Sequence, residues 1–361
     1  MLDNTFYKLT HDKALTVGYF GGSITEGSGA SDASRTSWRA RTTDWFRTGY
    51  PDADVREIQA AIGGTGSDLG MYRCDADLLS KNPDLVFVEF AVNDSGMAYN
   101  AVLCQAEAIY RKIRKHDPTT DIVCVITTTK SITDNLERGG EFTARSAHSV
   151  IAHRYGAPVI DIGNLLHFEV LKTGGDYLRF TTDTVHPNDD GYMIYTDCIT
   201  AFLRKWADGA SGECREHPMP SPAAFDGKVY DNARMISCTS ADGYTSDGFT
   251  FVEKSLCGRY PSYIEASVPG STFSFTFDGE NCGFYWMLAK DSGDALVSVD
   301  GGDEISVRSW DSYCKSFNRA GAAFFAKGLP YGTHRVTVRL ADTKADESEG
   351  TVLRIGALLI S

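Results

Sequence analysis

The sequence predicts two domains: an α/β domain built on a parallel sheet, followed by an antiparallel β-sandwich. The chain has 361 residues, more than the roughly 100–200 that a single domain usually holds. Up to about residue 205, short apolar runs alternate with segments of helical spacing, which is typical of a parallel sheet covered by helices. Beyond about residue 225 the apolar pattern has period two with glycine-containing turns, as in β-sandwiches.

The first pattern is clearest at Asp84–Val92 (DLVFVEFAV), a nearly continuous apolar, β-branched run. Such a run is expected of a central parallel strand buried on both faces. Apolar runs and helical spacing place the other elements of this domain. We expect further strands at 14–20, 55–61, 121–127 and 158–162, and helices at 34–50, 101–115 and 189–206.

A stretch rich in proline and glycine, residues 208–222, separates the two patterns and predicts a linker. The expected domains are therefore 1–208 and 225–361, joined by a linker at 209–224. Within the second domain, alternating runs predict strands at 271–277, 295–299, 305–307 and 334–340.

Composition excludes several function classes. The net charge is −13 with a pI of about 5.1, and the sequence has no basic run, so neither nucleic acid nor an anionic membrane surface is an expected partner. A neutral substrate fits this charge, although solubility alone would also explain it. Hydrophobic residues make up 42% of the chain, which is ordinary for a soluble globular protein.

The sequence also bears on cellular location, on the state of the cysteines and on metal binding. No apolar run reaches the roughly 18 residues that a membrane span needs, and the first ten residues have no signal-peptide pattern, so we expect a cytoplasmic protein. The nine cysteines are expected to be mostly buried thiols. Histidine spacing shows no metal pattern, and we expect neither a metal nor a cofactor.

A glycine-flanked serine directly follows the first predicted strand, in Gly21–Gly27 (GGSITEG). A nucleophilic serine needs a sharp turn, which small glycines allow, and nearby amides of a helix N-terminus. An ordinary glycine-rich turn is the alternative. The segment does not match the known nucleotide-binding loops. The phosphate-binding loop needs lysine after the glycine, where this sequence has Ser28 after Gly27, and the dinucleotide-binding pattern needs glycine at the position of Ser23.

Two more loops carry donors suited to an oxyanion hole. They are Ile62–Gly66 (IGGTG), after the second strand, and Ala91–Asp94 (AVND), after the third. A glycine amide and an asparagine NH₂ are neutral donors to a developing negative charge. Each alone is equally well an ordinary turn. In an open parallel sheet, however, the carboxyl ends of the strands border the ligand crevice, where these loops are expected to meet.

The last motif is Asp183–Asn188 (DTVHPN). An aspartate three residues before a histidine can accept its Nδ1–H and so turn Nε2 toward the serine. A surface Asp-x-x-His, or half of a metal site, is the alternative reading.

Together these motifs resemble the SGNH (GDSL-like) hydrolases, whose four blocks centre on Ser, Gly, Asn and His. The resemblance spans Ala14 to Trp206 and implies a flavodoxin-like three-layer domain and two-step ester hydrolysis. Gly22, in place of the usual aspartate, and Ala91, in place of a glycine, depart from the family pattern. The resemblance implies a triad of Ser23, Asp183 and His186, with an oxyanion hole from Ser23, Asn93 and Gly64, for which Gly63 is an alternative register.

The second domain is similar to carbohydrate-binding-like jelly rolls attached to sugar esterases. The whole architecture resembles the acetylmannan esterases of carbohydrate esterase family 17. This implies an acetylated oligosaccharide as substrate, with the module contributing to the cleft. Aromatic planes stack on sugars, so Trp310, Trp286 and Tyr313 are candidates for substrate binding, with sandwich core as the alternative for Trp286.

Two other functions remain open from the sequence. One is a short-chain lipid esterase or thioesterase. The other is a catalytically dead carbohydrate-binding protein, which the intact set of Ser23, Asn93, Asp183 and His186 argues against.

Overall fold

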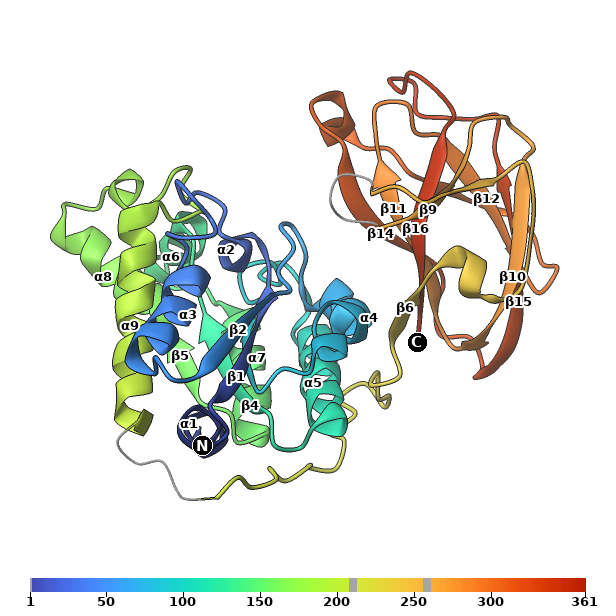
Figure 1. Cartoon of the computed structure of the whole chain (residues 1–361). Coiled ribbons are helices and arrows are strands. Elements are labelled where there is room, and N and C mark those ends of the chain that lie inside the picture. Colours follow the sequence, from blue (N-terminus) through green and yellow to red (C-terminus); the bar gives the residue numbers. More distant parts are fainter. Residues whose placement is uncertain (1, 208–212, 256–260) are drawn as a thin grey trace. The chain divides into compact units, whose positions relative to one another are not determined.

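The computed structural model describes residues 2–207, 213–255 and 261–361, and the chain forms two compact units, Met1–Asn232 and Ala233–Ser361 (Figure 1). The described part of the predicted linker, residues 213–224, belongs to the first unit. There the Arg215 amide donates to Asn4 (2.8 Å), His217 Nε2 lies 2.7 Å from Asp121, and the Ala223 amide donates to Glu107. The chain passes from one unit to the other after Asn232.

The first unit is built on a five-stranded parallel sheet in the order β2-β1-β3-β4-β5. This is the flavodoxin-like order, with its ligand crevice outside the carboxyl ends of β1 and β3. The predicted α/β fold is thus confirmed. The strands are β1 (Ala14–Gly21), β2 (Asp54–Gln59), β3 (Leu85–Glu89), β4 (Asp121–Ile126) and β5 (Val159–Asp161).

Helices cover both faces of this sheet, with α3, α8 and α9 on one side and α4, α5 and α7 on the other (Figure 1). β3 and β4 are buried along their whole length, which explains their continuous apolar sequences. Besides α2, described below, the α-helices are α1 (Asp3–Tyr7), α3 (Trp38–Gly49), α4 (Ser67–Asp77), α5 (Tyr99–His116), α6 (Lys130–Glu137), α7 (Thr143–Arg154), α8 (Ile162–Lys172) and α9 (Asp189–Ala207).

Trp38 anchors the packing of α3 on the sheet. Its ring meets Tyr19 of β1 edge-on at 5.2 Å and Phe87 of β3 at 5.7 Å, and the latter two rings stack at 5.3 Å. All three side chains are fully buried. Aromatic pairs of this geometry add about 0.5–1.5 kcal/mol each beyond their buried area, so this cluster fixes α3 against the centre of the sheet.

Helix α4 is not among the helices that the sequence predicted. The helix begins at Ser67, and Gly70 lies inside it. A Cβ at Gly70 would lie 3.0 Å from the Phe90 ring and 3.2 Å from Ile109. Glycine is therefore present because α4 packs closely on its neighbours, not because the chain turns there.

The second unit is a sandwich of two antiparallel sheets, as predicted, while jelly-roll connectivity remains a prediction. One sheet has the order β13-β12-β15-β10-β7 and the other β14-β11-β16-β9-β8, with β6 paired to β16. The strands are β6 (Arg234–Ile236), β7 (Asp242–Asp247), β8 (Thr250–Val252), β9 (Tyr263–Ala266), β10 (Thr272–Gly279), β11 (Cys282–Leu288), β12 (Asp294–Val299), β13 (Ile305–Arg308), β14 (Arg319–Ala326), β15 (Gly332–Leu340) and β16 (Leu353–Ile360).

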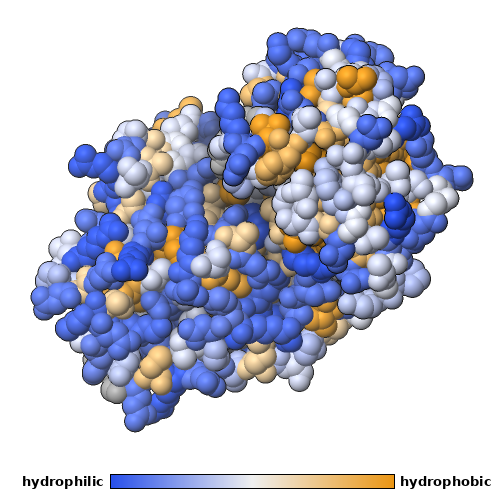
Figure 2. Space-filling model, turned by 45° about the vertical axis from the view of Figure 1, so that its right-hand side comes forward, coloured by the Kyte–Doolittle hydropathy of each residue, from blue (hydrophilic) through white to orange (hydrophobic). Residues whose placement is uncertain are grey.

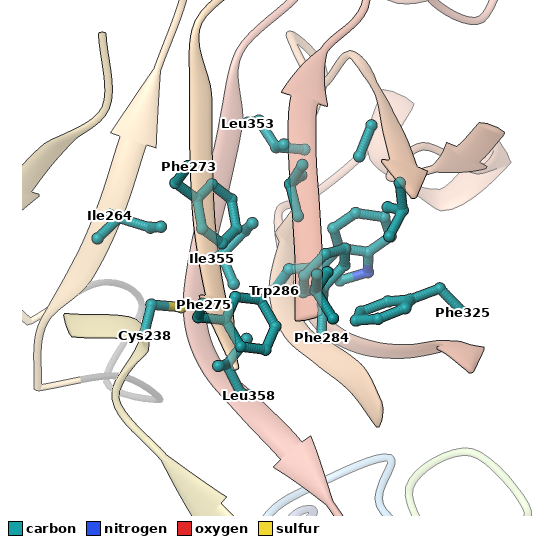
Figure 3. Packing of buried hydrophobic residues seen from close by; sticks show 14 of the residues in the cluster. Cys238, Ile264, Phe273, Phe275, Phe284, Trp286, Phe325, Leu353, Ile355 and Leu358 are labelled. Atoms are coloured by element: carbon teal, nitrogen blue, oxygen red, sulfur yellow. The ribbon is translucent and has the colours of Figure 1, made fainter. Parts of the chain in front are cut away.

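The core of this unit lies between its two sheets and shows why one candidate residue was misassigned. β11 is buried at every position, so its sequence lacks the alternation of a half-exposed strand. Trp286 lies in this core beside Phe284 and near Phe325, and its ring centroid is 5.2 Å from that of Phe284 (Figure 3). With 1% of its surface exposed, Trp286 presents no face to a sugar, and its assignment to substrate binding is wrong.

The face drawn in Figure 2 is mostly hydrophilic, with apolar residues in small groups. Eight cysteines in the described ranges are free thiols, and Cys257 lies outside those ranges. None of the described helices has both the length and the apolarity to cross a membrane.

Candidate active site

Ser23 occupies the turn from the central strand β1 into the short helix α2 (Ser23–Glu26). β1 ends at Gly21, and Ser23 is the first helical residue. Amides in the first turn of a helix have no acceptor within it, so the Ser23 N–H is available to a ligand. Gly27 ends the helix with φ 103°, a left-handed conformation that glycine adopts without strain.

Asp183 and His186 lie on the tight loop before α9. The Thr182 amide donates to the His186 carbonyl (2.8 Å), which closes the loop. Thr184 has φ 68°, a conformation that costs a non-glycine residue about 1–3 kcal/mol. This turn brings the Asp183 carboxylate back onto its own loop, where it accepts from the Val185 and His186 amides at 3.0 and 2.8 Å.

The side chains of Asp183, His186 and Ser23 form one hydrogen-bonded chain. His186 Nδ1 lies 2.7 Å from Asp183 Oδ2, and Nε2 lies 2.8 Å from Ser23 Oγ. Burial by itself raises the pKa of Asp183, but hydrogen bonds from the His186 amide and ring and the Val185 amide outweigh it and hold that pKa below its ordinary value. An ionised carboxylate only accepts, so Nδ1 carries the proton and Nε2 is free to take one from Ser23.

The structure distinguishes the two glycines that the sequence offered as oxyanion donors. The Gly63 amide donates to Glu26 Oε2 at 2.8 Å, so it is already engaged. Gly64 has φ 75°, and its N–H has no acceptor within the described ranges. This geometry favours Gly64 over Gly63.

Asn93 lies against the turn that carries Ser23. A Cβ built on Gly22 would lie 2.1 Å from Asn93 Oδ1 and 3.3 Å from the Thr65 carbonyl. The Asn93 carboxamide thus occupies the space beside the Ser23 backbone that a side chain at position 22 would need. This explains the glycine that departs from the family pattern.

A buried hydrogen bond between Asp94 and His148 anchors the Asn93 loop. Asp94 Oδ2 lies 2.8 Å from His148 Nε2 on α7, and Asp94 Oδ1 accepts from the Ser67 amide at 2.9 Å. Both side chains are at most 2% exposed. His148 could not be recognised as a partner from the sequence, because only the tertiary fold brings α7 beneath this loop.

Glu89, the last residue of β3, is a second group that sequence reasoning missed. Its carboxyl is fully buried and accepts from Thr25 Oγ1 and Thr127 Oγ1, both at 2.7 Å. Burial, only partly offset by the two threonine hydrogen bonds, raises its pKa to about 7. A lone acid inside the apolar run of 84–92 was the available signal.

The contact between Gly22 and Asn93 gives a prediction. Gly22→Ala should lower kcat about 10²-fold, because the new methyl displaces an oxyanion donor whose loss typically costs 10²–10³-fold. The main clash is with the end of a side chain, and the Thr65 carbonyl has to give by only a few tenths of an ångström, so the melting temperature should change little. Kinetics with p-nitrophenyl acetate and thermal unfolding measure both quantities.

A mutant cycle tests whether this effect passes through Asn93. Gly22→Ala and Asn93→Ala should be strongly non-additive, since both act on one carboxamide. Gly49→Ala is the matched control, because its Cβ would meet nothing within 4 Å. Fully additive losses would show that Gly22 acts elsewhere.

The remaining aromatic candidates lie in the second unit, described by itself. Trp310 is half-buried and packs against the sandwich core. Tyr313 is 61% exposed, with the Arg319 guanidinium 5.7 Å from its ring centroid. Within the described ranges, no group of three or more His, Cys, Asp or Glu side chains is placed to hold a metal ion.

Comparison with known proteins adds two findings. Residues 19–194 match the GDSL-like Lipase/Acylhydrolase family. No curated protein matches the chain.

Among solved structures, the chain is similar to a two-domain esterase (CEX) active on acetylated mannans, at 24% identity and a TM-score of 0.82. The match covers 100% of this chain and 95% of that one. A second structure of such an esterase, co-crystallized with mannopentaose, gives a TM-score of 0.80 at 24% identity, covering 96% and 90% of the two chains. Both units therefore share their folds with these esterases.

The family match covers the end of β1, all of β3 and the loops that carry Ser23, Asn93 and His186. Residues 19–194 match the GDSL-like lipase/acylhydrolase family, and this match supports carboxylic ester hydrolase activity.

Proposed function

We propose that the protein is a carbohydrate acetylesterase that removes O-acetyl groups from acetylated mannooligosaccharides, with Ser23, His186 and Asp183 as its catalytic triad. The observation that carries this proposal is the hydrogen-bonded chain from Asp183 through His186 to Ser23. The Gly64 amide and the Asn93 carboxamide supply the oxyanion hole together with the Ser23 amide.

The reaction proceeds by acyl transfer. Ser23 Oγ attacks the acetyl carbonyl carbon while His186 Nε2 takes the hydroxyl proton, and the tetrahedral oxyanion accepts from the donors of Ser23, Gly64 and Asn93. Collapse breaks the bond to the sugar oxygen, which leaves as a hydroxyl with the proton from His186. A water then attacks the acetyl-Ser23, again giving its proton to His186, and acetate and free Ser23 are released.

Support for a sugar substrate comes from the architecture and the charge. The two-domain esterases whose folds match both units are active on acetylated mannans. A net charge of −13 suits a neutral saccharide better than a polyanion. In the β-module, Tyr313 has an exposed ring and Trp310 a partly exposed one, so these two residues are our candidates for stacking on sugar.

Acetate release from O-acetylated mannooligosaccharides tests the proposal, with p-nitrophenyl acetate and p-nitrophenyl octanoate assayed in parallel. We expect acetate release by the wild-type protein, and none above background by Ser23→Ala. Ser34→Ala is a matched control, since its hydroxyl is exposed and bonds locally to Asp32.

The other outcomes overturn separate parts of the proposal. Ser23-dependent hydrolysis of nitrophenyl esters alone would keep the triad and exclude the mannan substrate. Preference for octanoate would point to a lipid esterase. Mannooligosaccharide binding without any Ser23-dependent hydrolysis would favour a carbohydrate-binding protein.

A further inference from the structure

A fully buried arginine lies beneath the candidate site. Arg73 projects from α4 and is 1% exposed. Its guanidinium donates to the carbonyls of Ala60 and Gly21, the latter at 2.9 Å, and to Thr65 Oγ1 at 3.3 Å. The acceptors are a strand-end carbonyl, a carbonyl just beyond a strand and a loop hydroxyl. Gly21 is far in sequence from Ala60 and Thr65, which lie at the two ends of one loop.

These contacts fall on the segments that deliver the oxyanion donors. Gly21 is two residues before Ser23, and Thr65 directly follows Gly64. The guanidinium carbon also lies 4.5 Å from the ring centroid of Phe20 and 5.7 Å from that of Phe90. Phe90 begins the loop that carries Asn93. The Arg73 side chain therefore contacts the segments that carry all three proposed oxyanion donors, those of Ser23, Gly64 and Asn93.

Burial of the Arg73 charge destabilises the folded protein unless hydrogen bonds compensate for the lost hydration. A buried cation costs free energy unless it is paired and hydrogen-bonded, and its carboxylate partner, Asp77 at 3.1 Å, is 34% exposed. The other described hydrogen bonds of the guanidinium go to main-chain and hydroxyl oxygens near the carboxyl ends of the strands. Only a planar fork of N–H groups spans these acceptors at once.

We infer that Arg73 is a positioning residue that holds the Ser23, Gly64 and Asn93 donors in the geometry of the transition state. This inference rests on the proposed function. Arg73 contacts no reacting atom, so its contribution appears in kcat and leaves ground-state binding nearly unchanged.

Steady-state kinetics of the full chain with p-nitrophenyl acetate test this assignment. Arg73→Lys keeps the charge but not the fork, and it should lower kcat about 10²-fold with KM changed less than about threefold, as for a small misplacement of catalytic groups. Thr65→Val removes the hydroxyl that accepts from Arg73 and donates to the Ile62 carbonyl within the same loop, and it should lower kcat less. The double variant should be no worse than Arg73→Lys, because both changes break the same link.

Arg114→Lys is the matched control. Arg114 is 3% exposed and donates to the Thr120 carbonyl. Thr120 directly precedes β4, so this contact lies at the amino ends of the strands, away from the candidate site. It should lose thermal stability to a similar degree while kcat stays near the wild-type value. Added guanidinium ion at millimolar concentration should restore part of kcat to Arg73→Ala and none to Arg114→Ala.

The outcomes separate the two proposals. If wild-type hydrolysis does not depend on Ser23, the proposed function fails and the role of Arg73 fails with it. If hydrolysis depends on Ser23 but Arg73→Lys and Thr65→Val keep their kcat, or Arg114→Lys loses as much, only the role of Arg73 is overturned. Should Arg73→Lys not fold, Thr65→Val alone decides the question.

Discussion

Replacing His186 by alanine is expected to lower kcat on p-nitrophenyl acetate by about 10⁶-fold, and Asp183→Asn by about 10⁴-fold, as in other serine hydrolase triads. Among the described residues, His186 is the base hydrogen-bonded to the Ser23 hydroxyl, whereas Asp183 acts through the tautomer of His186. An asparagine still accepts the Val185 and His186 amides that bond Asp183 now. The loop is therefore expected to keep its shape while the carboxylate is lost.

A double variant tests whether Ser23 and His186 act together or contribute independently to kcat. The double variant Ser23→Ala with His186→Ala should be no slower than either single variant, because the two residues act as a unit. Asp190→Asn is the control for Asp183→Asn, since Asp190 lies nearby in an exposed pair with Arg179 that is worth little. An Asp183→Asn protein with wild-type kcat would exclude Asp183 from the triad.

The Glu89→Gln protein is expected to be more stable than the wild type at pH 8, by up to about 3 kcal/mol. The pKa of Glu89 rises from 4.5 to about 7 on folding, and one pKa unit corresponds to about 1.4 kcal/mol. Between these values the folded protein binds more protons than the unfolded chain, so wild-type stability falls as pH rises from about 4.5 to about 7. Glutamine removes this titration and can still bond Thr25 and Thr127.

Urea unfolding of the first unit at pH 5 and pH 8 measures this difference. The gain from Glu89→Gln should be large at pH 8 and small at pH 5. Glu107→Gln is a contrasting control, because Glu107 is equally buried but accepts the Ala223 amide and lies 3.6 Å from Arg154, so glutamine should destabilise. A Glu89→Gln protein that loses stability at pH 8 would mean that the buried carboxylate is stabilised as a charge.

The parts of the fold that the sequence predicts are those with a strong one-dimensional signal. β3 and β4 are buried on both faces, so their apolar runs stand out. Ser23, His186 and Asp183 were recognisable because residue type and spacing carry their chemistry, and the turn at Thr184 closes their loop locally.

What the sequence left out depends on distant partners. Arg73 and His148 look like ordinary surface residues of helices until α4 and α7 pack beneath the catalytic loops. Helix α4 was not predicted, because glycine disfavours helix and nothing local shows that Gly70 packs against Phe90. Trp286 was ambiguous because β11, buried on both sides, has no alternation to separate core from surface.

The irregular stretch 213–232 changes where a usable fragment of this protein could be cut. Asp121 is fully buried, and His217 from this stretch holds one of its oxygens, while Asp231 pairs with Arg111 on α5. A fragment ending after α9 would leave buried carboxylate and guanidinium groups without these partners. An autonomous fragment of the first unit therefore has to include residues 213–232. The boundary for exchanging the second unit thus lies after Asn232, well past α9.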